Sequence, residues 1–208
     1  MKRTLDIIAA ILLIVLLVPL FLIIIIMIKL TSSGPVLFYQ RRIGLNRKEF
    51  DIIKFRTMRI DTPANVPTHM FENPDTFITP VGKVLRKTSL DELPQLFNIL
   101  KGDMSLVGPR PALYNQEDLI ELREQFGVHS MRPGLTGWAQ VNGRDELEIS
   151  AKVEYDRYYV DNWSICLDIN FRDAGNGSLA FRERNILDGQ GLAVKTHLRA
   201  AVRAGLNN

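Results

Sequence analysis

An uninterrupted apolar run occupies most of the first thirty residues. From Ile7 to Ile28 no side chain carries a charge or a hydrogen-bonding group, and the run is 22 residues long. As a straight helix it would extend roughly 33 Å, which matches the hydrocarbon thickness of a bilayer. A cleaved signal peptide has an apolar region of only about 7 to 15 residues, so we expect this run to be retained as a membrane anchor.

A proline and the flanking charges indicate how the run meets the membrane. Pro19 lies near its middle and predicts a break or kink, because it removes one backbone donor. Lysine and arginine favour the cytoplasmic side, and here they stand at both ends of the run: Lys2, Arg3, Lys29, Arg41, Arg42, Arg47 and Lys48. We therefore predict a re-entrant helix bent at Pro19. A single span with a proline kink is the alternative that the residues leave open.

The remainder of the chain has the composition of one soluble-like domain. A length of 208 residues leaves room for one domain of ordinary size beside the membrane element. The net charge of +3 favours anionic partners without choosing among them. Cys166 is the only cysteine, which excludes an intramolecular disulfide and a cysteine-based zinc site. The three histidines occur in no nucleophile motif and with no zinc-ligand spacing.

A β-hairpin is expected directly after the apolar run. Residues 36–40 and 50–56 are rich in aromatic and β-branched side chains, and Gly44-Leu45-Asn46 supplies a turn between them. Its basic residues would face lipid headgroups or a phosphate, or would simply be solvated: Arg41, Arg42, Lys54 and Arg56. Four prolines make the segment 61–80 irregular.

Helical periods and glycines organise the rest. Helices are predicted at 81–87, 113–126 and 148–159, and a helical period also runs through the apolar positions of 88–100. Gly102 predicts the stop of that helix, and Gly108-Pro109-Arg110-Pro111 a rigid extended loop. The glycine-rich segment 132–144 would be extended and suited to close approach of a ligand.

The adjacent acidic residues Asp91 and Glu92 form the candidate reaction centre. Neighbouring helical residues point about 100° apart, so the two carboxylates can serve different roles on one ligand. Two structural interpretations stay open. Ser89 and Glu92 have the spacing of a capping box. Alternatively, Asp91 caps the helix itself, which would put Pro94 in the first turn.

Three arginines lie in stiff segments punctuated by glycine or proline: Arg86, Arg110 and Arg144. Guanidinium groups bind phosphates through paired hydrogen bonds. A magnesium ion takes carboxylate and phosphate oxygens, which the acidic pair would help to supply. Together these residues suggest phosphate chemistry, although each arginine alone also fits a solvated surface charge.

Several motifs follow one another in a fixed order along the chain. They are Arg3-Thr4-Leu5-Asp6-Ile7, Lys54-Phe55-Arg56-Thr57-Met58, the run from Gly82 through Arg86, Asp91 and Glu92 to Asn98, Lys101-Gly102-Asp103-Met104-Ser105, Val107-Gly108-Pro109-Arg110-Pro111, Arg132-Pro133-Gly134-Leu135-Thr136-Gly137 and Gln140-Val141-Asn142-Gly143-Arg144. From about residue 2 to about residue 169, the chain closely resembles the bacterial sugar transferase family, the monotopic phosphoglycosyl transferases.

The resemblance implies a two-step phosphoglycosyl transfer. Asp91 would attack the β-phosphate of a UDP-sugar and expel UMP. Undecaprenyl phosphate would then take the sugar phosphate from the phosphosugar-aspartyl enzyme, in a ping-pong mechanism that initiates polysaccharide or glycoconjugate assembly. Glu92 would serve Mg²⁺, while Arg86 and Arg110 would bind phosphates. Arg144 would contact the donor.

The implied fold is α+β: a mainly helical monotopic membrane protein with a re-entrant helix broken at Pro19, a small β-hairpin and surface amphipathic helices. Its parts would be the membrane helix at 1–33, a catalytic domain at 34–169 on the cytoplasmic face of the bacterial inner membrane, and a divergent tail at 170–208. Implied partners are a UDP-sugar, undecaprenyl phosphate and membrane lipids, and no nucleic acid. A homodimer is compatible with this arrangement.

Two departures from the family pattern stand out. Val18 occupies the position before the bend proline, where family members often have serine. Residues 170–177 break the lysine-rich helix usual in the family, although 192–206 has the pattern of a basic amphipathic helix. Two other functions stay open on the residues alone: a non-enzymatic membrane-anchored adaptor, and a metal-dependent diphosphatase at the membrane surface.

Overall fold

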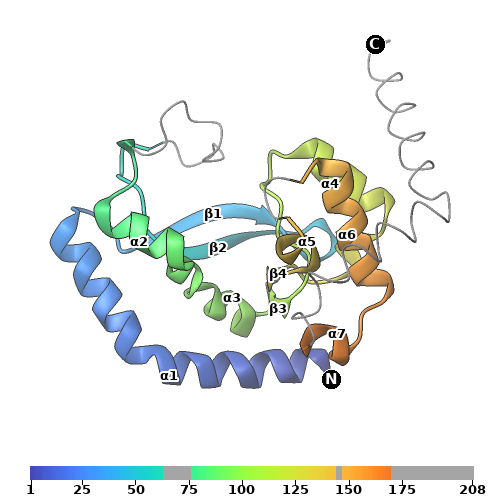
Figure 1. Cartoon of the computed structure of the whole chain (residues 1–208), viewed down its shortest axis with the longest axis horizontal. Coiled ribbons are helices and arrows are strands. Elements are labelled where there is room, and N and C mark those ends of the chain that lie inside the picture. Colours follow the sequence, from blue (N-terminus) through green and yellow to red (C-terminus); the bar gives the residue numbers. More distant parts are fainter. Residues whose placement is uncertain (63–75, 144–146, 170–208) are drawn as a thin grey trace, which may run out of the picture. The chain divides into compact units, whose positions relative to one another are not determined.

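Figure 1 shows the computed structural model of the chain, which describes residues 1–62, 76–143 and 147–169. Arg144, residues 170–208 and the helix predicted at 192–206 lie outside the described residues, as does most of the proline-rich segment. The chain forms two compact units, Met1–Gly137 and a second that begins at Trp138.

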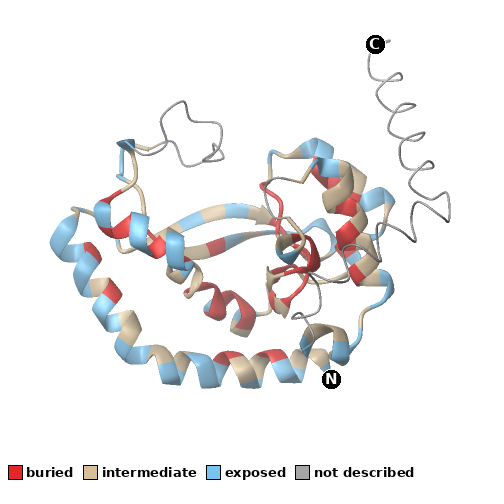
Figure 2. Ribbon diagram, viewed as in Figure 1, coloured by how far each residue is buried: buried red, intermediate tan, exposed pale blue. Residues whose placement is uncertain are grey.

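The N-terminal apolar run forms one long helix, α1 (Lys2–Thr31), with Pro19 inside it. In Figure 1 the helix changes direction near its middle. Within the described residues it is the one helix long and apolar enough to cross a membrane, with a mean hydropathy of 3.7 over its most apolar window. Figure 2 shows that most of α1 is exposed. These apolar side chains are unfavourable in water, which is consistent with a membrane environment.

Both halves of α1 pack against the rest of the first unit. In the first half, Ala10 belongs to a core cluster with residues of the hairpin, of α3 (Gln95–Lys101) and of the segment after α3: Ile52, Leu96, Ile99 and Met104. In the second half, Ile24 and Ile28 belong to a cluster whose other members are Phe55, Val81 and Leu85. A bent helix can follow the same body along both clusters, whereas a straight helix of this length would diverge from one of them.

Polar contacts tie the start of α1 to the unit. The guanidinium of Arg3 donates to the carbonyl oxygens of Ile99 (2.6 Å) and Leu100 (3.1 Å) near the end of α3. The buried carboxylate of Asp6 accepts a hydrogen bond from the Ser105 hydroxyl at 2.8 Å. Carbonyl groups in the last turn of a helix lack partners within that helix, so Arg3 stabilises α3 as well as α1.

The end of α1 is tied by a buried arginine. Arg56 donates from Nη2 to the Ser32 carbonyl (3.0 Å) and from Nη1 to the Ser33 carbonyl. Its side chain was expected to face headgroups, a phosphate or solvent. That expectation was wrong, because Arg56 is buried and its guanidinium donates to backbone carbonyls of the chain that leaves the helix.

The predicted hairpin is present, formed by β1 (Leu37–Ile43) and β2 (Glu49–Phe55), which pair antiparallel from Leu37 opposite Phe55 to Ile43 opposite Glu49. The connection is a single turn, η1 (Leu45–Arg47), in which Asn46 and Arg47 have positive φ. Asparagine tolerates this conformation better than most residues, so the predicted turn has a local cause.

The segment around the acidic pair is broken into short helices. It comprises α2 (Pro80–Thr88), η4 (Leu90–Glu92) and α3. Thr79 caps α2 by accepting from the Gly82 N–H at 3.0 Å. Gly82 is required by space, because a Cβ there would overlap the Thr57 carbonyl group. Gly102 ends α3 with φ 104°, as predicted from the sequence.

The remaining elements of the first unit are β3 (Ser105–Val107), α4 (Glu117–Gln125), η5 (Val128–Ser130) and β4 (Gly134–Thr136). β3 and β4 pair in parallel, with Ser105 opposite Gly134 and Val107 opposite Thr136. The helix predicted at 113–126 is shorter in the structure, where α4 begins at Glu117 and ends at Gln125. Part of the segment 132–144, which was expected to be extended, forms β4.

The second unit contains α5 (Trp138–Val141), α6 (Ile149–Asp161) and α7 (Ile165–Ile169). α6 confirms the helix predicted at 148–159, and Trp138 contacts Tyr158 with ring centroids 5.6 Å apart. Asp168 accepts from the Tyr159 hydroxyl at 2.6 Å, which ties α7 to α6. The described elements are mostly helical with small sheets, as the α+β prediction required. The boundaries predicted at 33 and 169 and the re-entrant insertion stay predictions.

Candidate active site

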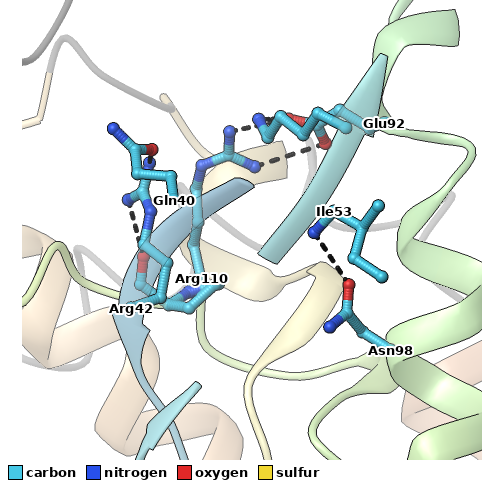
Figure 3. A network of polar contacts seen from close by, with 8 residues as sticks. Gln40, Arg42, Ile53, Glu92, Asn98 and Arg110 are labelled. Atoms are coloured by element: carbon cyan, nitrogen blue, oxygen red, sulfur yellow. Dashed lines mark hydrogen bonds and ion pairs between the residues drawn. The ribbon is translucent and has the colours of Figure 1, made fainter. Parts of the chain in front are cut away.

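Glu92 lies between two cations. Lys54 Nζ donates to Glu92 Oε1 at 2.6 Å, and Arg110 Nη2 donates to the same oxygen at 2.9 Å. The side chains of Lys54 and Glu92 are only 15% and 17% exposed, whereas that of Arg110 is 35% exposed. Figure 3 shows the Arg110 guanidinium facing the Glu92 carboxylate. Arg110 is thus partly exposed and lies beside the more deeply buried ion pair of Lys54 and Glu92.

Segments far apart in the sequence supply these groups. Lys54 belongs to β2, Glu92 to η4, and Arg110 to the loop that follows β3. Asn98 fixes α3 to the edge of the hairpin. Its side chain accepts from the Ile53 N–H at 2.9 Å (Figure 3) and also donates to the Asp51 carbonyl at 2.8 Å. Asn98 is fully buried, so both bonds hold α3 against β2 without competition from water.

The two cations determine the charge of Glu92. Burial alone would raise the pKa of this carboxyl, but Arg110 and Lys54 outweigh burial and lower its pKa to about 2. Burial lowers the pKa of Lys54, and the neighbouring Glu92 opposes that shift. Glu92 is therefore a carboxylate at neutral pH, and it offers acceptor oxygens.

Asp91 is the more buried member of the acidic pair, with a relative exposure of 9%. Burial raises the pKa of its carboxyl, Lys54 and Arg86 act in the opposite direction, and the adjacent Glu92 adds to the rise. A carboxylate that is partly desolvated and less stabilised than its neighbour is the more basic and more nucleophilic of the two. The pair thus offers one oxygen nucleophile and one strongly ionised acceptor.

Both capping interpretations of this segment were wrong. Ser89 has a left-handed backbone with φ 57°, which ends α2 and separates it from η4. Ser89 makes no side-chain capping bond to η4. Asp91 lies inside η4 and the residue before α3 is Pro94, so Asp91 is not in the position that caps α3. The Glu92 carboxylate turns to Lys54 and Arg110, and only its backbone N–H meets the Ser89 carbonyl, at 3.2 Å.

The structure brings most of the predicted site residues into one unit. Arg86 lies in α2 and acts on Asp91 through its charge. Arg110 pairs with Glu92. Pro19 lies inside α1. Arg144 lies outside the described residues, so its role stays a prediction.

Sequence reasoning missed the partnership of Lys54 with Glu92. Lys54 was expected to face headgroups, a phosphate or solvent, and its deep position comes from strand pairing, which no local pattern encodes. The available signal was a basic motif at the end of a strand, Lys54-Phe55-Arg56. Arg42 was misassigned for the same reason: it donates to the Pro111 carbonyl at 3.0 Å and to the Gln40 side chain at 2.6 Å.

The donor chemistry of Asp91 and Glu92 fits magnesium in part. Mg²⁺ is commonly bound through one or two carboxylates together with substrate phosphates and several waters. Across residues 1–62, 76–143 and 147–169 there is no group of three or more histidine, cysteine or acidic side chains placed to hold a metal. The pair therefore suits an ion that arrives with a phosphate ligand better than one enclosed by protein.

Comparison with known proteins places these residues in a family context. Residues 1–172 match the family described as bacterial sugar transferase, which is most of the chain. The chain belongs to the bacterial sugar transferase family. This membership confirms the resemblance inferred from the motifs, which include the acidic pair and Arg110.

Three members of the family illustrate the range of lengths. The uncharacterized sugar transferase EpsL of Bacillus subtilis is 40% identical over 96% of this chain and 94% of its own length. UDP-N-acetylgalactosamine-undecaprenyl-phosphate N-acetylgalactosaminephosphotransferase of Aeromonas hydrophila is 43% identical over 81% of this chain and 41% of its own length. UDP-glucose:undecaprenyl-phosphate glucose-1-phosphate transferase of Escherichia coli is 43% identical, and the chain spans 38% of it.

Proposed function

We propose that this chain transfers a sugar 1-phosphate from a UDP-sugar to undecaprenyl phosphate and releases UMP. The observation that carries the proposal is the pairing of a buried, raised-pKa carboxyl, Asp91, with a carboxylate held by Lys54 and Arg110. The names of the Aeromonas and Escherichia relatives share undecaprenyl phosphate as the acceptor and differ in the sugar. We therefore assign the acceptor and leave the sugar to experiment.

In the first step, a carboxylate oxygen of Asp91 attacks the β-phosphorus of the UDP-sugar. A bond forms between that oxygen and the phosphorus, while the bond from the β-phosphorus to the bridging oxygen breaks. UMP leaves with the bonding electron pair. Lys54 and Arg110 supply positive charge near the acidic pair, which would stabilise the negative charge on the transferring phosphoryl group and on the leaving UMP.

In the second step, a phosphate oxygen of undecaprenyl phosphate attacks the phosphorus of the phosphosugar-aspartyl group. The new bond joins the two phosphates as a diphosphate, and the bond to Asp91 breaks, which returns its carboxylate. Covalent catalysis of this kind divides one displacement into two and leaves the enzyme unchanged.

Glu92 is the residue that would hold Mg²⁺ together with substrate phosphate oxygens. A bound magnesium ion would neutralise phosphate charge at the reacting centre. Lys54 and Arg110, which neutralise Glu92 in the structure described here, would then be able to contact phosphate oxygens as well.

A re-entrant α1 at the cytoplasmic face of the inner membrane would complete this arrangement. The proposal is supported by the contacts at both ends of the helix, since Arg3 and Arg56 fasten the two ends to the same unit. If the rest of the first unit lies on one side of the membrane, these contacts keep both ends of α1 on that side. The reaction centre would lie at the surface where a lipid phosphate is available.

The test is UMP release by the purified full-length chain from a panel of UDP-sugars, with Mg²⁺ and undecaprenyl phosphate. We expect UMP and a lipid-linked sugar for at least one donor, and neither from Asp91→Asn. Asp161→Asn is the matched control, because Asp161 is an exposed acidic residue paired with Arg157, and it should behave as wild type. UMP release without a lipid product would indicate hydrolysis. No UMP from any donor would contradict the proposal.

A further inference from the structure

The loop that carries Arg110 is held by its carbonyl groups. Four consecutive carbonyl oxygens, from Pro109 to Ala112, each accept a hydrogen bond from elsewhere in the first unit. Their donors, in order, are the Gly134 N–H (2.9 Å), Arg123 Nη1 (2.7 Å), Arg42 Nη1 (3.0 Å) and the Ile43 N–H (3.0 Å). Pro109 and Pro111 lack N–H groups, so this segment cannot be held by a regular ladder of donors and acceptors.

Arg123 makes the contact at Arg110 itself. It belongs to α4, its side chain is buried with a relative exposure of 2%, and it binds the carbonyl of Arg110 itself. Burying a guanidinium group is unfavourable unless it is hydrogen-bonded. The buried guanidinium of Arg123 donates to the backbone of a candidate site residue, which suggests a role for Arg123 in the site as well as in packing.

Arg110 has the opposite arrangement. Its backbone is fixed by Arg123, while its guanidinium is partly exposed and reaches Glu92. A long side chain aims its terminal group reliably only when its backbone is held, and small misplacements of a phosphate-binding group are costly to catalysis.

We propose that Arg123 is a positioning residue for the transfer reaction, which it serves by fixing the backbone from which Arg110 reaches Glu92 and the phosphates. This inference rests on the proposed function. Arg123 touches no reacting group in this account, and its whole effect passes through Arg110. Arg42, a residue of the hairpin that also contacts Gln40, binds the carbonyl of Pro111 (Figure 3). Arg123 is the residue of α4 that binds the carbonyl of Arg110.

The test is a double-mutant cycle of Arg123→Met with Arg110→Ala, read as kcat/KM for UMP release. We expect Arg123→Met alone to lower kcat/KM by about 10-fold to 100-fold. In the Arg110→Ala background the same change should cost less than about threefold, because the group that it positions is gone. Arg123→Lys retains a donor and should recover most of the activity. Equal losses in both backgrounds would overturn the proposal.

Arg3→Met is the matched control. Arg3 also donates to backbone carbonyls in the first unit, at Ile99 and Leu100, but it does not contact the Arg110 loop. Both single variants should lower the thermal unfolding temperature. Only Arg123→Met should have an effect that depends on whether Arg110 is present. An equally strong dependence for Arg3→Met would show a general loss of stability and would also overturn the proposal.

A second readout does not depend on activity. Amide hydrogen exchange at Ile43 and Gly134 reports whether the loop stays attached, since both N–H groups donate to loop carbonyls. We expect faster exchange at both in Arg123→Met and unchanged exchange in Arg3→Met. Unchanged exchange in Arg123→Met would overturn the inference even if the enzyme is active. If the wild-type chain releases no UMP, faster exchange in Arg123→Met would still support the loop contact while the proposed function fails.

Discussion

Glu92 shows how strongly neighbouring charges can oppose burial. Its carboxylate is 17% exposed, yet Lys54 and Arg110 keep its pKa near 2. The folded-state pKa is therefore below that of the unfolded chain. The stability that Glu92 contributes is fully present above about pH 4.5 and is lost as the pH falls towards 2.

A Glu92→Gln variant should lose this part of the pH dependence. Between pH 4.5 and 2 we expect the free energy of unfolding of the wild type to fall by roughly 2 kcal/mol more than that of the variant. At pH 7 the variant should also be less stable, because Lys54 keeps its burial without its carboxylate partner. Denaturant unfolding of the detergent-solubilised protein at pH 7, 4.5, 3 and 2 measures both effects. Parallel pH profiles would show that Glu92 is not the titrating group.

Ser89 has a role that lies in its backbone. Its positive φ separates α2 from η4 and so sets the direction of the acidic pair. A β-branched residue resists this conformation, so Ser89→Val should lower the free energy of unfolding by about 1 to 2 kcal/mol and reduce activity.

Ser89→Gly is the comparison for that variant, because glycine adopts positive φ without strain. It should retain both stability and activity. Thermal unfolding and UMP release of the two variants provide the measurement, and equal losses in both would assign the role to the Ser89 side chain instead.

At the scale of elements, local patterns predicted the molecule better than long-range contacts did. The hairpin, α2, α6 and the stop at Gly102 follow from β-branched content, apolar period and a glycine, and all are present. The apolar period of 88–100 also predicted one helix, but the left-handed Ser89 and the turn η4 interrupt it. Periodicity records which side chains are buried and carries no signal for a single residue that changes the chain direction.

The candidate site divides in the same way. Asp91, Glu92 and Arg110 were predicted because they stand in recognisable motifs. Two contacts join residues from different elements: the ion pair of Lys54 with Glu92, and the hydrogen bond from Arg123 to the Arg110 carbonyl. Such contacts depend on strand pairing and helix packing, which a single sequence does not specify.

The bent α1 leads to a prediction about topology. Single cysteines at Lys2 and Leu30, in a Cys166→Ser background, should both react with a membrane-impermeant maleimide from the cytoplasmic face. Leu16→Cys is the control: Leu16 is 73% exposed in the structure but would be covered by lipid, so it should react from neither face. Labelling of the two ends from opposite faces would show a single span and contradict the re-entrant insertion.

At the scale of the whole molecule, similar proteins match this chain over very different shares of their own length. The chain covers nearly all of EpsL but only 41% of the Aeromonas enzyme, and the regions that match contain the acidic pair and its cations. We therefore propose that the chemistry takes place in the first unit, Met1–Gly137, which contains Lys54, Asp91, Glu92 and Arg110.

The central claim is that Asp91 carries the sugar phosphate between the two substrates. The direct measurement is incubation of the full-length chain with Mg²⁺ and a UDP-sugar labelled in the sugar, without acceptor, followed by intact-mass and peptide analysis. The account predicts a phosphosugar adduct on Asp91, one equivalent of UMP, and loss of the adduct when undecaprenyl phosphate is added. UMP release that requires the acceptor, with no adduct on the protein at any time, would contradict it.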